Sequence, residues 1–412
     1  MRGSHVRRGT NLPRMGDFNQ SVILDAIRRS SEGLSRVELV ELIGLSPQAV
    51  SNITRRLLAE ELIVEAGKAG SGPGKPRTIL RINPSGRFAI GVHLDPAVMT
   101  VLLMDLMGVV LQRRVRETPV ETEPARIIEI IADEVRALIE ESSVDPARIE
   151  GIGVAPPGPI DQPAGAVVDP PLLRGWSRVP LRDALAEATD MPVFVEKDVT
   201  AAAVAEIWAG GHESTRSFVF VYIGTGIGSG IVVDGEVLRG TSGNAGEIGH
   251  IVTDSNGPEC SCGMRGCIAV TCDPQSLVRE AEALGVLNGE RHRNGDVADG
   301  LLRLCAIAEE GNELANEILD RAAVRTARAV SVVTNLLDVD RVVFGGPFWE
   351  PLAKRYLEVM PSSLPSYRAA RSIHPLELVS TRISDDVAAV GAACLLLEQT
   401  LGPRAERLML AQ

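Results

Sequence analysis

The stretch GEIGHIVTDSNGPECSCGMRGC, from Gly246 to Cys267, places one histidine and three of the chain's six cysteines close together. Imidazole nitrogen and thiolate sulfur are donors that zinc prefers, and four protein ligands leave no coordination position open for catalysis. In a cytosolic chain this clustering favours a metal over disulfides. We therefore predict a structural zinc ion whose binding energy helps to fold a loop-rich segment. The predicted ligands are His250, Cys260, Cys262 and Cys267.

The charge of the chain is unevenly distributed. The 412 residues suit two or three domains and carry a net charge of −12. Residues 1–88 hold fourteen Arg/Lys against eight Asp/Glu, so their balance is +6 and that of the remainder is −18. A basic head on an acidic body is typical of a protein that contacts nucleic-acid phosphates at one end, with chance clustering as the alternative.

The sequence lacks the marks of a membrane or secreted protein. No apolar run approaches the roughly 20 residues of a membrane-spanning helix. The start of the chain lacks the apolar stretch of a signal peptide. We expect a cytoplasmic protein that does not contact a membrane and that is nucleoid-associated when bound to DNA.

The head predicts three helices. Apolar spacing favours a helix over 17–29, and Ser35 with Glu38 forms a capping box that opens a short second helix ending at Gly44. Ser46 and Pro47 then begin a third helix, which has one apolar face. The opposite face carries four polar side chains, namely Gln48, Ser51, Asn52 and Arg55.

These side-chain types suit the reading of base edges in a major groove, where Arg pairs with guanine and Asn or Gln with adenine. The alternative is an ordinary solvated face. Two strands, 62–65 and 77–82, flank a Gly-rich segment, 66–76, in which Lys75 and the following Arg77 can approach phosphates or a minor groove. A plain linker is the alternative for this segment. Helix, turn, helix and hairpin together predict a winged helix-turn-helix domain over 1–88 that binds double-stranded DNA.

The body predicts an α/β fold. Strands are expected within 88–105 and at 151–154, with an amphipathic helix over 124–141 between them, which implies a largely parallel sheet. A second pair of strands, 217–233, is interrupted by the glycine-rich turn 224–228. Such a turn lets backbone N–H groups approach a ligand, typically a phosphate.

Together these motifs resemble the ROK family (repressors, open reading frames and kinases), specifically its regulator branch with an N-terminal winged helix. The resemblance covers nearly the whole chain and includes the spacing from His250 to the cysteines. It implies a two-lobed actin-like or hexokinase-like (ribonuclease H-like) body that assembles as a dimer or tetramer. Lobe I would span 89–205, completed by 385–412, and lobe II would span 206–384 with the zinc site and an oligomerisation surface. Further matching motifs are Leu34–Arg36, Gly44–Ser46, Val50–Ser51, Gly74–Pro76, Gly345–Gly346 and Gly391–Ala393.

The chain departs from the family where a kinase holds ATP. Kinases of the family have Asp-x-Gly-Gly-Thr-Lys where this chain has His93-Leu94-Asp95-Pro96-Ala97-Val98. Pro96 lacks an N–H, Ala97 lacks a hydroxyl and Val98 replaces the cation, so the phosphates lose their partners. The family's catalytic base matches Asp198, but a base without a held γ-phosphate cannot transfer it. We therefore expect a protein that is not an enzyme, with Asp198 as a vestigial base.

The resemblance also implies a sugar site. Two departures, Lys197 in place of asparagine and Ala269 in place of a glutamate, predict altered ligand choice or weak sugar binding. His250 would serve twice, with one ring nitrogen on zinc and the other toward the cleft. The alternative is that Asp198 and Glu247 persist as a structural remnant. The expected ligand-binding residues are Gly158, Lys197, Asp198, Glu247 and His250.

The resulting hypothesis is a repressor of carbohydrate-metabolism genes that binds a near-palindromic operator and responds to a sugar or sugar phosphate. Two alternatives stay open. One is a ROK sugar kinase with an accessory DNA-binding domain, and the other is a regulator controlled by a protein partner.

Overall fold

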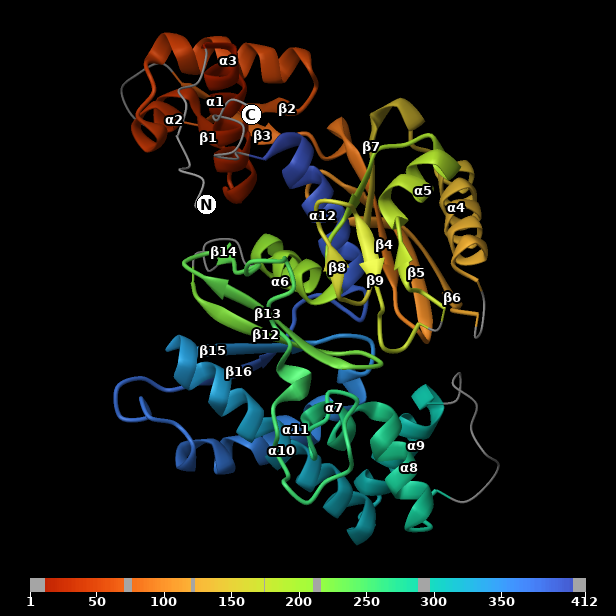
Figure 1. Ribbon diagram of the computed structural model, residues 1–412. Coiled ribbons are helices and arrows are strands. Elements are labelled where there is room, and N and C mark those ends of the chain that lie inside the picture. Colours follow the sequence, from red (N-terminus) through yellow and green to blue (C-terminus); the bar gives the residue numbers. More distant parts are fainter. Residues whose placement is uncertain are drawn as a thin grey trace, which may run out of the picture.

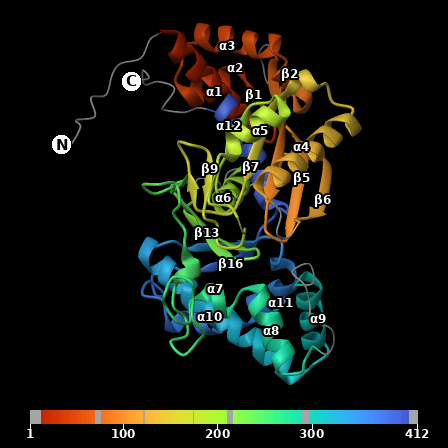
Figure 2. The same cartoon turned by 45° about the vertical axis from the view of Figure 1, so that its right-hand side comes forward.

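The computed structural model describes residues 12–69, 76–119, 123–173, 175–209, 216–287 and 297–402. A small helical head, a first lobe and a second lobe follow one another along the long axis of the molecule, as two views show (Figures 1 and 2). None of the helices in these parts of the chain is long and apolar enough to cross a membrane. The predicted fold class, a winged-helix head on a two-lobed α/β body, is confirmed.

The head contains three helices and a three-stranded sheet with the strand order β1-β3-β2. Its core is formed by buried apolar residues of all three helices and of the sheet, such as Ile23, Leu39, Leu57 and Leu80. The elements are α1 (Leu12–Arg29), β1 (Leu34–Ser35), α2 (Arg36–Ile43), α3 (Pro47–Ala59), β2 (Ile63–Ala69) and β3 (Arg77–Ile82).

Local hydrogen bonds fix the ends of the head helices. The Ser35 hydroxyl accepts from the Glu38 N–H, while the Glu38 carboxylate accepts from the Ser35 N–H at 2.7 Å. Gly44 ends α2 at φ +75°, a left-handed conformation that glycine adopts without strain. The Ser46 hydroxyl caps α3 by accepting from the Ala49 N–H at 3.2 Å.

The wing differs from the expected loop in one respect. The strand β2 continues to Ala69, because Ala69 pairs with Arg77 beyond an irregularity between Glu65 and Lys68. Residues 66–69 of the glycine-rich segment therefore belong to the sheet. Residues 70–75, which include Lys75, lie outside the described part of the chain.

Lobe I is built on a five-stranded sheet with the order β11-β7-β4-β5-β6. The strands β4, β7 and β11 are parallel, whereas β4, β5 and β6 form an antiparallel meander. The predicted parallel pairing is therefore correct for β4, β7 and β11 and wrong for β5 and β6. The turns of the meander are short, and short turns can join only antiparallel strands. The strands are β4 (Phe88–Leu94), β5 (Val98–Asp105), β6 (Val110–Glu117), β7 (Ile149–Ala155) and β11 (Val193–Val195).

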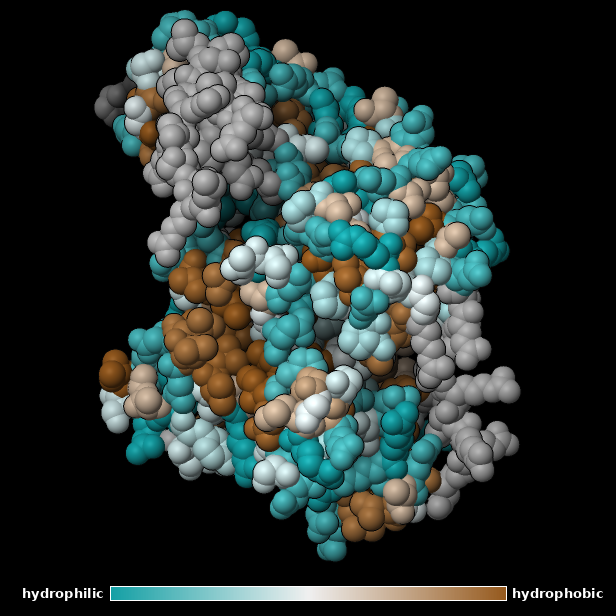
Figure 3. All heavy atoms as spheres, viewed as in Figure 1, coloured by the Kyte–Doolittle hydropathy of each residue, from teal (hydrophilic) through white to brown (hydrophobic). Residues whose placement is uncertain are grey.

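Lobe II repeats this topology. Its sheet has the order β14-β13-β12-β15-β16, again an antiparallel meander followed by two parallel strands. The strands are β12 (Phe218–Ile223), β13 (Ile227–Val233), β14 (Glu236–Val237), β15 (Arg341–Gly345) and β16 (Glu377–Ser380). Figure 3 shows apolar side chains gathered on the left of the view, at the level of this sheet.

Helices and short strands complete the two lobes. Those in the first half are η1 (Pro84–Gly86), α4 (Pro124–Glu141), η2 (Pro146–Arg148), β8 (Ile160–Asp161), β9 (Ala166–Val168), β10 (Arg178–Val179), α5 (Leu181–Thr189) and α6 (Asp198–Ala209). Those in the second half are η4 (Ile248–His250), α7 (Ile268–Thr271), α8 (Pro274–Ala283), α9 (Val297–Glu309), α10 (Glu313–Leu337), α11 (Trp349–Ser363), η6 (Leu364–Ser366) and α12 (Val387–Leu401).

The helices α6 and α12 pack against each other between the lobes. The helix α12 lies on β4 and β7 of lobe I, and α6 lies on β12 and β13 of lobe II, so each half sends its last helix to the sheet of the other half. Small residues allow this close packing. A Cβ added to Gly391 would lie 1.8 Å from the carbonyl oxygen of Ala201, a distance that no real side chain tolerates.

Candidate DNA-binding and ligand-binding sites

The polar face of α3 is exposed. Gln48, Asn52 and Arg55 are exposed and Ser51 is half-buried, while Val50 and Leu57 on the opposite face lie in the core. The amide of Gln48 donates to the Asn52 Oδ1 at 3.2 Å, and Arg55 donates to the same oxygen at 3.4 Å. Three of the four predicted base-reading side chains thus form one row on the helix.

Contacts within the head hold α3 against α2 and the wing. The Arg36 guanidinium at the start of α2 donates to the Thr54 hydroxyl at 3.0 Å and to the Glu65 carboxylate at 3.4 Å. Arg77 is exposed at the base of the wing, close to Glu38 of α2. Hydrogen bonds from Ser35, together with the charge of Arg77, lower the pKa of Glu38.

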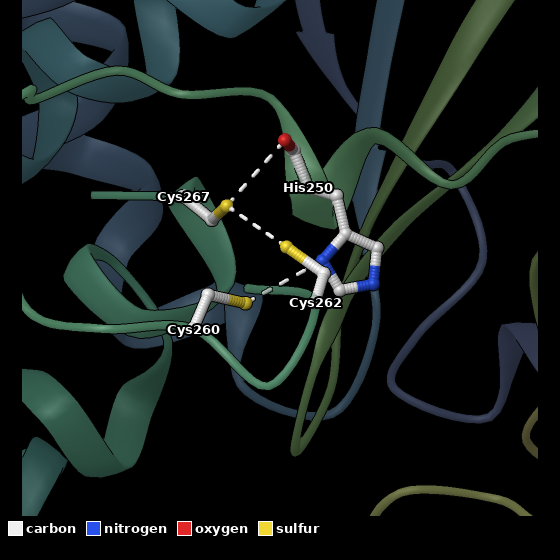
Figure 4. Close-up of side chains that lie close together, drawn as sticks. All are labelled: His250, Cys260, Cys262 and Cys267. Carbon is white, nitrogen blue, oxygen red and sulfur yellow. Dashed lines mark hydrogen bonds between the residues drawn. The ribbon is translucent and has the colours of Figure 1, made fainter. Parts of the chain in front are cut away.

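The four predicted metal ligands form one cluster (Figure 4). The donor atoms of His250, Cys260, Cys262 and Cys267 all lie within 4.8 Å of one another. The Cys262 and Cys267 sulfurs are 3.6 Å apart, and the Cys260 sulfur is 3.5 Å from the His250 Nδ1. A tetrahedron with metal–sulfur bonds of about 2.3 Å has edges of about 3.8 Å, so the donor set fits a tetrahedral metal ion. The His250 Nε2 remains free of this cluster (Figure 4).

A carboxylate that follows β4 accepts hydrogen bonds from the glycine-rich turn between β12 and β13. Asp95, at the end of β4, accepts from the Thr225 N–H at 3.2 Å and from the Thr225 hydroxyl, and Thr225 lies in the turn between β12 and β13. The Ala97 N–H donates to the same carboxylate at 2.8 Å. The glycine-rich turn expected to approach a phosphate thus offers this donor to Asp95 instead.

A second contact ties the same two strands together. The Tyr222 hydroxyl of β12 and the His93 Nε2 of β4 are 3.0 Å apart, and both side chains are buried. Burial lowers the pKa of His93 and raises that of Tyr222 well above its usual value. At neutral pH this is therefore a hydrogen bond between two uncharged groups.

The predicted ligand residues lie around the start of α6. The Lys197 ammonium forms an ion pair with the Glu247 carboxylate. Glu247 directly precedes η4, whose last residue is His250. The Lys197 stem runs over Gly158, where an added Cβ would lie 2.8 Å from the lysine Cε. Burial raises the pKa of Asp198 to about 7, against the opposing charge of Lys197. Gly158, Lys197, Asp198 and Glu247 are thus brought together.

The sequence did not predict a contact between the head and α6. The indole of Trp208, in the last turn of α6, lies under the Arg28 guanidinium of α1 with 4.0 Å between the guanidinium carbon and the ring centroid. The Trp208 Nε1 also donates to Glu398 of α12 at 2.7 Å. The helix that begins at Asp198 therefore ends against the DNA-binding head. Arg28 and Trp208 were not identified from the sequence, because only the folded chain brings them together.

The head is also docked directly on lobe I. Arg148 donates to the Glu61 carboxylate at 2.5 Å and to the Ser85 carbonyl at 2.9 Å. Arg87 and Glu150 form an ion pair at 2.8 Å. These contacts hold the head against lobe I.

A winged-helix head joined to a duplicated, kinase-like two-lobed body defines the class of protein, a DNA-binding regulator built on a sugar-kinase fold. The sequence profile of the ROK family matches residues 89–399, so the chain belongs to the ROK family. The predicted resemblance is confirmed.

Relatives of two kinds resemble the chain. The xylose repressor of Caldicellulosiruptor bescii is 24% identical over 93% of this chain and 96% of its own length. The glucokinase of Thermotoga maritima is 31% identical over 76% of this chain and 98% of its own length. The crystal structure of a ROK family transcriptional regulator, a homolog of the E. coli MLC protein, has a TM-score of 0.78 at 25% identity and covers 96% of this chain and 99% of its own. The xylose repressor and the transcriptional regulator thus span more of the chain than the glucokinase does.

Proposed function

We propose that this protein is a sugar-responsive transcriptional repressor of carbohydrate-metabolism genes. The single observation that carries the proposal is the combination of the head with the body. The xylose repressor and the ROK regulator align over more than nine-tenths of the chain, and the exposed polar row of α3 is suited to a major groove. The protein would act in the cytoplasm, on the nucleoid.

In this proposal residues 1–88 form the DNA-binding domain. Gln48, Ser51, Asn52 and Arg55 would read base edges, while Arg77 and Lys75 would contact phosphates beside them. Two copies of the chain would place two heads on a near-palindromic operator, as a dimer or within a tetramer. Exposed apolar residues of lobe II, such as Val233 in β13 and Leu336 in α10, support self-association through that lobe.

The body would be a sensor in which zinc is structural. It would comprise lobe I at 89–205 with 385–412, and lobe II at 206–384. His250, Cys260, Cys262 and Cys267 would hold the ion with all four positions filled, which leaves none for substrate. A sugar or sugar derivative would bind at Gly158, Lys197, Asp198, Glu247 and His250. Asp95 argues against kinase activity, because its carboxylate repels phosphate and occupies the Thr225 donors.

The helix α6 offers a direct route from ligand to DNA. It carries Asp198 at its first position and Trp208 near its end, about 15 Å away at 1.5 Å per residue. A ligand that shifts the start of α6 would shift Trp208 and, through the stacked Arg28, the head helix α1. Coupling of this kind requires the ligand to bind the two arrangements with different affinity.

A selection from random duplexes tests the DNA-binding proposal. The full-length protein is expected to enrich one near-palindromic sequence, and Asn52→Ala and Arg55→Ala should each lose about 10- to 100-fold in affinity for it. Arg126→Ala, an exposed substitution on α4 of the body, is the matched control and should bind like the wild type. Failure of the wild-type protein to enrich any sequence would contradict the proposal.

A second candidate, a sugar kinase with an accessory DNA-binding domain, is favoured by the glucokinase similarity and by the retained Asp198. A coupled ATP assay over a panel of sugars distinguishes the two functions. The repressor proposal predicts no turnover above background. Turnover that Asp198→Asn abolishes would establish the kinase instead.

A further inference from the structure

Lys197 is a buried cation with a single side-chain acceptor among the described residues. Its side chain is 5% exposed, and its ammonium contacts only the Glu247 carboxylate, whose own side chain is 52% exposed. An ammonium group has three donors, so two of them lack a protein partner in the described part of the chain. A buried charge with one half-exposed partner is poorly compensated as a structural element but is suited to recognise a ligand of opposite charge.

The site around Lys197 is more positive than the resemblance to the family implies. The resemblance implies an amide at position 197 and a carboxylate at position 269, where this chain has the ammonium of Lys197 and the methyl of Ala269. Ala269 belongs to the same region, since a Cβ added to Gly249, next to His250, would lie 3.4 Å from the Ala269 Cβ. Both changes make the site more positive, by two charges in total. Asp198 and Glu247 are the carboxylates that remain beside Lys197.

We propose that the ligand of this body is a monosaccharide that carries an anionic group, a carboxylate or a phosphate, which pairs with the Lys197 ammonium. This inference rests on the proposed sensor function and specifies its ligand class. The anion would replace Glu247 as the partner of Lys197. A neutral sugar cannot do so, because taking the carboxylate from a buried ammonium without replacing its charge is strongly unfavourable.

The exchange of partners also has a structural consequence. Lys197 directly precedes α6, whereas Glu247 directly precedes η4 in lobe II, so their ion pair joins the two lobes. A ligand anion that takes over Lys197 releases Glu247 and with it this contact between the lobes. An anionic sugar would therefore alter the position of α6 relative to lobe II, whereas a neutral sugar would leave the ion pair intact.

Calorimetry on the full-length, metal-loaded protein tests the inference with matched pairs of sugars. The probes are glucose against glucuronate, gluconate and glucose 6-phosphate, and galactose against galacturonate. We expect at least one anionic probe to bind 10-fold or more tightly than its neutral counterpart. Comparison of the carboxylate-bearing probes with glucose 6-phosphate shows which anion is preferred.

Two substitutions at the ion pair sharpen the test. Lys197→Asn, which restores the family amide, should lose the preference for the anion by 10-fold or more. Glu247→Gln should tighten binding of the anionic probe several-fold, because the competing carboxylate is gone while the shape is kept. Melting temperatures of both variants establish that they are folded.

The result that overturns the inference is equal or tighter binding of neutral sugars, or no binding of any probe. Duplex selection with the same preparations separates this outcome from failure of the proposed function. If a neutral sugar binds and changes DNA affinity, the regulator stands and the anion inference fails. If no duplex is enriched, the proposed function fails whichever sugar binds.

Discussion

The carboxylate of Asp95 accepts hydrogen bonds from both the backbone N–H and the hydroxyl of Thr225, across the boundary between the two lobes. Asp95 lies at the end of β4 and is 5% exposed. The contact joins the two lobes directly.

Removal of this carboxylate should destabilise the body. Asp95→Ala leaves the partly buried N–H groups of Thr225 and Ala97 without this acceptor, which we expect to cost about 1–3 kcal/mol in the free energy of unfolding. Urea unfolding at pH 7 measures the loss. Asp133→Ala, which breaks a surface ion pair with Arg136 in α4, is the control and should cost less than about 1 kcal/mol. Equal stability of the Asp95 variant and the wild type would show that the contact is dispensable.

The cysteine cluster should hold one zinc ion per chain. Cys267→Ser removes a ligand, so the variant should bind zinc weakly, and its melting temperature should fall toward that of the chelator-treated protein. Elemental mass spectrometry and thermal unfolding measure the two effects. Cys305→Ala alters a buried thiol of α9 outside the cluster and should keep its zinc. A wild-type protein that purifies without metal and melts unchanged in chelator would refute the assignment.

The wing should contribute through phosphate contacts. Lys75→Ala removes one such contact, so the slope of log affinity against log salt should become shallower by about 1, with similar weakening on all sequences. Fluorescence anisotropy at several salt concentrations gives the slope. Lys354→Ala, a substitution on the exposed surface of lobe II, is the matched control. An unchanged slope for the Lys75 variant would mean that the wing does not contact the backbone.

Asp198 should make stability depend on pH. Burial raises its pKa from 3.8 to about 7, so the folded protein holds this proton more tightly than the unfolded chain does. Its ionisation therefore costs folding free energy progressively between about pH 4 and pH 7. Asp198→Asn abolishes that cost. The stability of the variant relative to the wild type should increase from pH 4 to pH 7 and then stay constant. Parallel pH profiles of the two proteins would contradict this assignment.

Local features of the sequence were sufficient to predict the helices of the head and the metal cluster. Ser35 and Glu38 of the capping box are three positions apart, and His250 and Cys260 are ten positions apart, so spacing alone predicts both features. Contacts between distant segments could not be predicted from local spacing. Asp95 and Thr225 are 130 residues apart, and nothing in the local pattern of either indicates the other.

The strand arrangement was predicted less well for a related reason. Alternation of strands and helices indicated parallel pairing, but the meander of β4, β5 and β6 depends on two short turns at Pro96–Ala97 and Met107–Gly108. The strand β6 was missed, because its residues are mostly exposed and lack an apolar pattern. Strands of this kind are defined by their neighbour and not by their own sequence.

A ligand in the body should change the affinity of the head for DNA through α6. The most direct measurement is the affinity of the selected operator duplex with and without the tightest-binding sugar of the panel, for the wild type and for Trp208→Ala. We expect the bound sugar to change the DNA affinity of the wild type by about 5- to 150-fold and that of the variant by less than about 2-fold, although the variant still binds both sugar and DNA. Arg28→Ala should behave in the same way if the stacked pair carries the coupling. A wild-type protein whose DNA affinity is the same with and without the bound sugar would contradict the account.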